Sequence, residues 1–159
     1  MDQSHADNTQ LIESLYEHFA AGRGEQMAAL YHPDARFRDP VFQELLGPRA
    51  GHMWRMLTGR AKGLVITASG IQADAASGQA HWAARYTFST GRPVHNRIDA
   101  RFRFEDGLII EHVDSFSLWL WSRMALGLPG TLLGWSPLMR RKIQRQAMQG
   151  LERWEAKYA

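Results

Sequence analysis

The fold is decided by residues 94–117, which read VHNRIDARFRFEDGLIIEHVDSFS. Apolar and charged side chains alternate along 97–104, which is typical of a strand with one buried face. The apolar face would hold Ile98, Ala100, Phe102 and Phe104, and the opposite face Arg97, Asp99, Arg101 and Arg103. Because a Glu-Asp-Gly turn follows at 105–107, the segment predicts two antiparallel strands.

The second of these strands carries two polar residues on one face. His112 and Asp114 are two positions apart, so they would share that face with Ile110 and Phe116. Burying a carboxylate and an imidazole is costly unless they are paired. The pattern therefore indicates either a pocket for acid–base chemistry, or a satisfied buried pair or a solvated face without function.

Helices are expected before the sheet. An apolar stripe from Leu11 to Ala20, capped by Asn8 or Thr9, predicts a first helix. A short second helix is expected through Met27, Leu30 and Tyr31, ended by Pro33. A strand at 35–39 and a third helix around residues 53–57 follow, and further strands are expected at 64–69, 80–89, 94–104 and 108–117. This order predicts an α+β fold with the helices on one face of an antiparallel sheet.

The residues after Phe116 read differently. Glycines and prolines at 127–130 and 134–137 interrupt an apolar helical stretch, and a basic amphipathic helix is expected from about Pro137 to Trp154. We therefore expect one domain, 1–159, in which 118–159 is a helical C-terminal extension. Its basic residues fit a solvated face, an anionic membrane or nucleic acid, but stacking aromatics are not interleaved with them, so nucleic acid is not expected as a partner.

Composition excludes several classes of site. The chain has 159 residues, 45% hydrophobic and 22% charged, and no cysteine, so disulfides, thiolate metal sites and a cysteine nucleophile are excluded. No apolar run approaches the ~20 residues of a membrane span, so stable membrane insertion is not expected. Residues 1–7 are polar and contain no signal region, so a cytoplasmic location is expected. His112 and Asp114 supply at most two metal ligands, so neither a metal nor a cofactor is expected.

Three motifs together resemble the nuclear transport factor 2-like superfamily, and within it the SnoaL-like polyketide cyclases and ketosteroid isomerases. They are a first helix with Tyr16, the segment 30–40 (LYHPDARFRDP) and the segment 104–109 (FEDGLI). The resemblance implies a cone-shaped curved sheet packed on three N-terminal helices, an apolar cavity and a homodimer. The superfamily also contains epoxide hydrolases and non-enzymatic binders, so the motifs specify the fold better than the reaction.

The resemblance also suggests roles for individual residues. Asp39 falls at the general base of ketosteroid isomerases, Tyr16 at their oxyanion-hole tyrosine and Tyr31 at a supporting tyrosine. The protonated aspartate that these isomerases also need is not matched, because the alternation places Ala100 on the inner face and Asp99 among arginines.

Asp114 resembles the acid/base aspartate of SnoaL-like cyclases and one catalytic aspartate of limonene-type epoxide hydrolases. The hydrolases also need an Arg-x-Asp on the second strand, where this chain has Arg85-Tyr86-Thr87.

The leading hypothesis is cofactor-free proton transfer on a small apolar molecule, of isomerase or cyclase (lyase) type. The expected catalytic residues are Asp114, His112, Asp39 and Tyr16, and the expected pocket lining is Tyr31, Phe37, Trp54, Trp82, Tyr86, Ala100, Phe102, Phe116 and Trp119. One alternative is a non-catalytic carrier of an apolar ligand, with tail tryptophans as a lid. Another is a membrane or protein adaptor that works through the basic tail.

Overall fold

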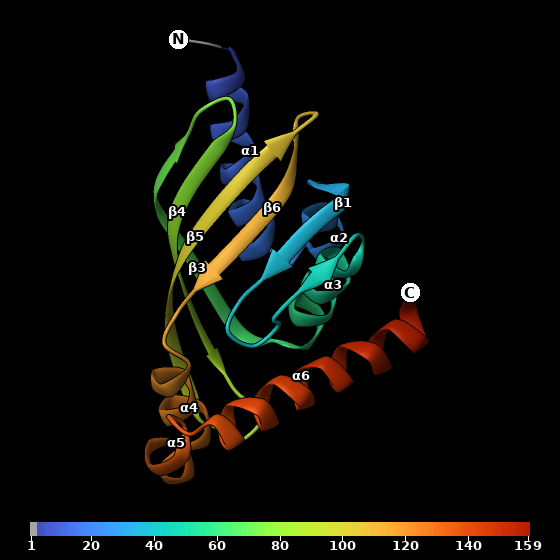
Figure 1. The fold of residues 1–159 in the computed structure, drawn as a ribbon. Coiled ribbons are helices and arrows are strands. Elements are labelled where there is room, and N and C mark those ends of the chain that lie inside the picture. The colour runs from blue at the N-terminus through green and yellow to red at the C-terminus, as the bar shows by residue number, and fades with distance from the viewer. Residues whose placement is uncertain (1–2) are drawn as a thin grey trace.

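A curved six-stranded sheet wraps around three N-terminal helices in the computed structural model, which describes residues 3–159 apart from the Lys62 side chain (Figure 1). Residues 1 and 2 of the polar N-terminal stretch lie outside the described residues. The helices are α1 (Gln3–Ala20), α2 (Gly24–Ala28) and α3 (Arg49–Arg60). The strands are β1 (Tyr31–Arg38), β2 (Leu45–Leu46), β3 (Lys62–Ala73), β4 (Ser77–Thr87), β5 (Pro93–Glu105) and β6 (Leu108–Ser115). The predicted α+β cone is confirmed.

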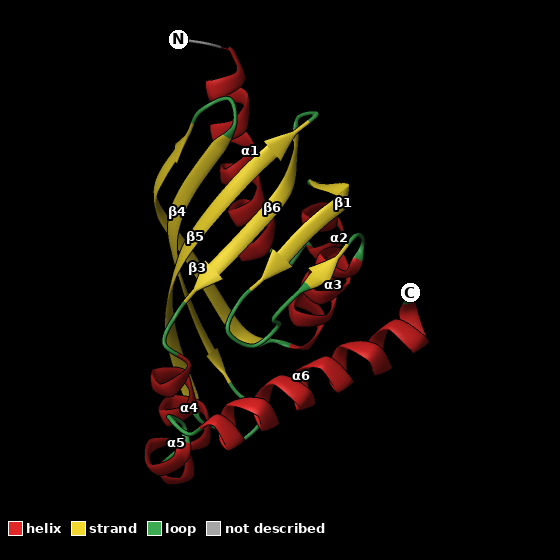
Figure 2. Ribbon diagram, in the orientation of Figure 1, coloured by secondary structure: helices red, strands yellow, loops and turns green. Residues whose placement is uncertain are grey.

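The strand order is β2-β1-β6-β5-β4-β3, and every neighbouring pair is antiparallel except β1 and β6. The parallel pairing brings the N-terminal segment beside the last strand, with Phe37 opposite His112. Residues about 75 positions apart in sequence thus become neighbours at the middle of the sheet (Figure 2).

The β5–β6 hairpin confirms the alternation of 97–104 but corrects the inner face of β6. Ala100 is buried, whereas Asp99 lies on the outer face, paired with His81 of β4. The register shifts between Arg103 and Phe104, so Phe104 pairs with Ile109 and Arg103 with Glu111. Ile110 is thereby the extra residue of a β-bulge, and Ile109, not Ile110, shares the buried face of His112.

Two predictions near the N-terminus are wrong. Helix α1 begins at Gln3, so Asn8 is no cap; its side-chain amide instead donates to the carbonyl oxygens of Asp74 and Ala75 in the β3–β4 turn. The second helix ends at Ala28, and Tyr31 already belongs to β1. Pairing with β6 overrides the local helical preference there, because the Ile109 N–H donates to the Leu30 carbonyl.

Three helices follow the sheet: α4 (Leu118–Leu126), α5 (Leu128–Leu133) and α6 (Pro137–Tyr158). Ser117 caps α4 and Ser136 caps α6. In Figure 1, α4 and α5 lie at one end of the sheet, and α6 runs back from them past α3. Glu155 of α6 accepts hydrogen bonds from Arg49 (2.7 Å) and binds His52 (2.7 Å), which fastens α6 to α3. Within 3–159, no helix has the length and apolarity to cross a membrane.

Candidate functional site

His112 and Asp114 form a buried pair inside the sheet. The His112 side chain is 1% exposed and that of Asp114 is 2% exposed, and His112 Nε2 lies 2.8 Å from Asp114 Oδ1. Strand β6 directs both inward because they are two residues apart beyond the bulge at Ile110. The prediction that these two residues share one face is therefore confirmed, and the burial of both side chains excludes a solvated face.

A chain of hydrogen bonds extends from this pair. Tyr31 Oη lies 2.8 Å from His112 Nδ1, and Trp54 Nε1 donates to the same oxygen at 2.8 Å. Because an indole N–H can only donate, we assign the Tyr31 hydrogen to His112 Nδ1 and the His112 hydrogen to Nε2, facing Asp114. In this assignment His112 Nε2 donates its hydrogen to Asp114 Oδ1.

A second tryptophan also reaches the carboxylate. Trp82 Nε1 donates to Asp114 Oδ1 at 3.3 Å, so this bond and the His112 bond end on the same oxygen, and neither occupies Oδ2. Aromatic rings enclose the pair: the Phe102 ring centroid is 4.4 Å from that of His112, and the Phe37 centroid 5.0 Å. Asp114 is thus a buried carboxylate with one oxygen held in place and apolar surroundings.

Tyr16 of α1 is the exception among these bonded groups. Its hydroxyl is buried, and among the described residues it has no hydrogen-bond partner. Its ring lies 6.0 Å from that of Trp82, the donor to Asp114. Burial, reinforced by the negative charge of Asp114, raises the Tyr16 pKa well above its ordinary value. Tyr16 therefore remains a neutral phenol with an unused donor on the side of the core where Asp114 lies.

Asp39 follows β1 at the start of the β1–β2 connection. Its Oδ1 accepts the backbone N–H groups of Val41 (2.7 Å) and Phe42 (2.6 Å), which makes it the turn-forming residue. Burial raises its pKa from 3.8 to about 7, opposed by the Phe42 N–H and supported by the charge of Asp114. Asp39 thus holds a turn and also titrates near neutral pH.

The predicted lining residues divide into two groups. Tyr31, Phe37, Trp54, Ala100 and Phe102 are buried in the same core cluster, and Trp82 and Tyr86 pack against it. Tyr86 also accepts a hydrogen bond from Trp121 (2.8 Å). Trp119 instead donates to the carbonyl of Thr131 in α5, and Phe116 is half-buried just after β6. The structure therefore brings seven of the nine to the core cluster.

The sequence pattern predicts Trp54 and Trp82 as lining residues and does not indicate the hydrogen bonds that they donate. One general rule could have indicated them, because a buried indole N–H needs a hydrogen-bond acceptor. The partner itself depends on strand pairing, because Tyr31, His112 and Trp54 come from three different elements.

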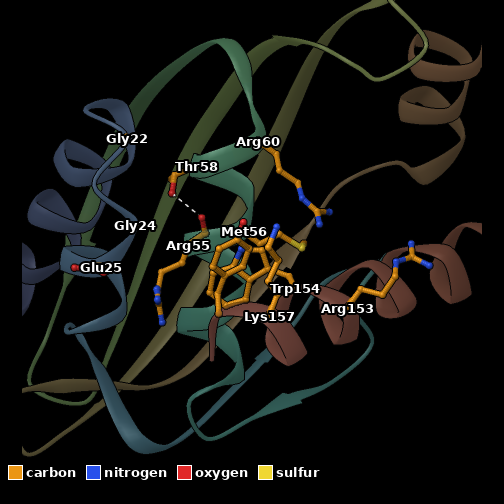
Figure 3. A pocket seen from close by; sticks show the side chains of 12 residues that line it. Gly22, Gly24, Glu25, Arg55, Met56, Thr58, Arg60, Arg153, Trp154 and Lys157 are labelled. Atoms are coloured by element: carbon orange, nitrogen blue, oxygen red, sulfur yellow. Dashed lines mark hydrogen bonds between the residues drawn. The ribbon is translucent and has the colours of Figure 1, made fainter.

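Two surface pockets have linings that include neither His112 nor Asp114. The larger, about 640 Å³, lies between α3 and α6 and is lined by Arg55, Arg60, Arg153 and Trp154 among others (Figure 3). The smaller, about 470 Å³, lies on the outer sheet face around His81 and Asp99. Because the Asp114 side chain is only 2% exposed, a ligand would reach it only if side chains around it move. Among residues 3–159, no cluster of three or more His, Asp or Glu could hold a metal ion.

The curved sheet, the three covering helices and the buried acid–base pair define a nuclear transport factor 2-like protein. The SnoaL-like domain family model matches residues 12–112, and the chain belongs to that family. The match runs from Ile12 of α1 to His112 of β6 and does not include Asp114 or the C-terminal helices.

Solved structures show the same fold at low sequence identity. An epoxide hydrolase of the LEH-like type from M. tuberculosis is similar with a TM-score of 0.66 and 18% identity, over 82% of this chain and 98% of that one. A SnoaL-like polyketide cyclase from Jannaschia sp. CCS1 gives 0.69 and 13%, over 81% and 97%. A polyketide cyclase from Xanthomonas campestris gives 0.62 and 18%, over 77% and 98%. No curated protein matches the sequence.

Proposed function

We propose that this protein is a cofactor-free enzyme that transfers a proton on a small apolar carbonyl compound, in a reaction of isomerase or cyclase type. The observation that carries the proposal is the buried Tyr16 hydroxyl without a partner. An unsatisfied buried hydroxyl costs about 1–3 kcal/mol, and a ligand oxygen that accepts its hydrogen would recover that energy. The Asp114 carboxylate, close enough to raise the Tyr16 pKa, supplies the base that such a ligand would meet.

Each residue has a distinct role in this mechanism. Asp114 takes a proton from the carbon next to the carbonyl, and the electron pair of that C–H bond moves toward the carbonyl oxygen. Tyr16 donates its O–H to this oxygen as negative charge develops there. His112 and Trp82 hold Asp114 Oδ1 by their N–H groups, which leaves Oδ2 as the base. Protonated Asp114 then returns the proton to another carbon of the substrate.

Isotope exchange tests the proposal whatever the final product of the reaction is. A thermal-shift panel of steroids, aromatic polyketides, terpene epoxides and fatty acids first identifies a ligand, because saturation at 100 times Kd stabilises a protein by about 2.7 kcal/mol. Carbonyl-containing hits are then incubated with the protein in D₂O, and NMR follows deuterium entry at the carbon next to the carbonyl. We expect wild-type exchange, and a loss of at least about 100-fold in Asp114→Asn with ligand binding retained.

Asp99→Asn is the matched control, because Asp99 is also an aspartate bonded to a histidine but lies on the outer sheet face. It should exchange at the wild-type rate. Equal exchange in Asp114→Asn and wild type would overturn the assignment of the base. Binding without exchange in the wild type would instead establish the second candidate, a carrier of apolar ligands. The carrier is favoured by the fact that His112, Tyr31 and Trp54 satisfy one another without any ligand.

A further inference from the structure

Large apolar side chains are exposed in one short segment after the sheet. Among residues 3–159, six of the nine large hydrophobic side chains that are exposed fall between positions 120 and 138. Five of them form what we call the α5–α6 tip: Leu128 (69% exposed), Leu132 (60%), Leu133 (51%), Trp135 (69%) and Leu138 (78%). In Figure 1 this segment lies at the far end of the molecule from the N-terminal end of α1.

The tip is held in a defined conformation. The Trp135 indole donates to the Leu132 carbonyl at 2.7 Å, and Ser136 Oγ accepts the Met139 N–H at 3.2 Å. These bonds keep the Trp135 ring outside the core, with its N–H satisfied. The exposure of the tip is therefore part of the fold.

Positive charge borders the tip. Residues 115–151 contain no Asp or Glu, and their five basic residues are Arg123, Arg140, Arg141, Lys142 and Arg145. All five are exposed, and none takes part in an ion pair identified within residues 3–159. Leu138, Arg141, Lys142 and Arg145 are spaced three, four and seven residues apart, so they lie on one face of α6. The apolar tip thus continues directly into a row of cations.

This combination fits an anionic bilayer better than a second copy of the chain. An isologous dimer through the tip would bring two sets of five cations together, with no acidic residue in 115–151 to offset them. A bilayer offers negative headgroups to the cations and an acyl boundary to Leu and Trp side chains. We propose that the α5–α6 tip docks the protein on the surface of membranes rich in anionic lipid.

Co-sedimentation with vesicles tests the proposal on the whole chain. The protein should bind vesicles of phosphatidylcholine that contain about 30% phosphatidylserine, a fraction that makes the surface negative. It should not bind vesicles of pure phosphatidylcholine. Binding should fall as salt is raised from about 0.05 to 0.5 M. Arg140→Gln/Arg141→Gln/Lys142→Gln should weaken binding about 100-fold, and Trp135→Gln about tenfold or more.

The matched control removes equal charge elsewhere. Arg97→Gln/Arg101→Gln/Arg103→Gln alters three exposed cations of the outer sheet face and should bind vesicles within about twofold of wild type. All altered side chains are exposed, and within residues 3–159 only that of Trp135 makes a hydrogen bond, to the Leu132 carbonyl. Circular dichroism checks that each variant is folded. Failure of the wild type to bind the anionic vesicles, or an equal loss in the control, would overturn the proposal. So would a wild-type dimer that Trp135→Gln converts to a monomer, because a second copy would then cover the tip.

Discussion

Asp39 should make the stability of this protein depend on pH in a way that Asp39→Asn removes. The pKa of Asp39 in the folded protein is about 7, against 3.8 for the ordinary carboxyl group. The folded state therefore binds a proton more tightly than the unfolded state does. Since this pKa is raised, the stabilising contribution is present below about pH 4 and is lost as the pH rises to about 7.

The magnitude follows from the difference in pKa. About 3 pKa units at about 1.4 kcal/mol each correspond to about 4 kcal/mol of unfolding free energy lost between pH 4 and pH 7. Asparagine keeps the side-chain oxygen that accepts the Val41 and Phe42 N–H groups but does not ionise. The difference in unfolding free energy between Asp39→Asn and the wild type should therefore change with pH. At pH 8 it should favour the variant by up to about 4 kcal/mol more than at pH 4.

Urea unfolding of both proteins at pH 4.5, 6 and 8 measures this difference. The other titrating groups are the same in both proteins, so their contributions to the pH dependence cancel in the difference. Asp34→Asn serves as the control, because Asp34 is an exposed aspartate of β1, the strand that Asp39 follows. Its difference from wild type should not change with pH. A difference for Asp39→Asn that is the same at pH 4.5 and pH 8 would refute the reasoning, since it would mean that burial does not perturb Asp39.

Three further predictions concern the core and the C-terminal helix. Tyr16→Phe should raise the unfolding free energy by about 1 kcal/mol, because it removes an unsatisfied hydroxyl, and should lower isotope exchange; a destabilised variant would show that the hydroxyl is bonded. His112→Leu should cost about 3–5 kcal/mol in urea unfolding, because the buried Asp114 loses one of the two N–H groups that hold it, and a cost below about 1 kcal/mol would contradict a stabilising role for the pair. Glu155→Gln should loosen α6 and speed proteolysis between α5 and α6. Because the Arg49 hydrogen bond lowers the Glu155 pKa from its ordinary value of 4.5, only acid below the ordinary range should do the same to the wild type, and it should leave the variant unchanged.

The inner and outer faces of the β5 strand and the turn after it were predictable, because they depend on residues close together in the sequence. Alternation along 97–104 places Ala100 inside and Asp99 outside whatever the rest of the chain does, since a strand turns each successive side chain to the other face. The Glu-Asp-Gly turn, with Asp106 and Gly107 both at positive φ, likewise follows from residue type. The bulge at Ile110 did not follow, because the shift depends on how β5 and β6 pair.

Local preference also misled at two points. Asn8 is a good helix cap in isolation, but its amide binds the β3–β4 turn, 66 residues away. Residues 27–31 have a helical pattern, but pairing with β6 draws Tyr31 into β1. Long-range hydrogen bonds outweighed propensity in both places, because a buried backbone or amide group must find a partner.

The sequence by itself determined that His112 and Asp114 share one face of a strand, because two residues on one strand need no further partner to be aligned. Only the tertiary structure decided what surrounds them. The parallel β1–β6 pairing brings Tyr31 to His112, α3 brings Trp54 to Tyr31, and β4 brings Trp82 to Asp114. Packing likewise leaves the Tyr16 hydroxyl without a hydrogen-bond partner among residues 3–159 and the α5–α6 tip exposed. Burial and satisfaction of polar groups are properties of packing among distant segments, which no local pattern encodes.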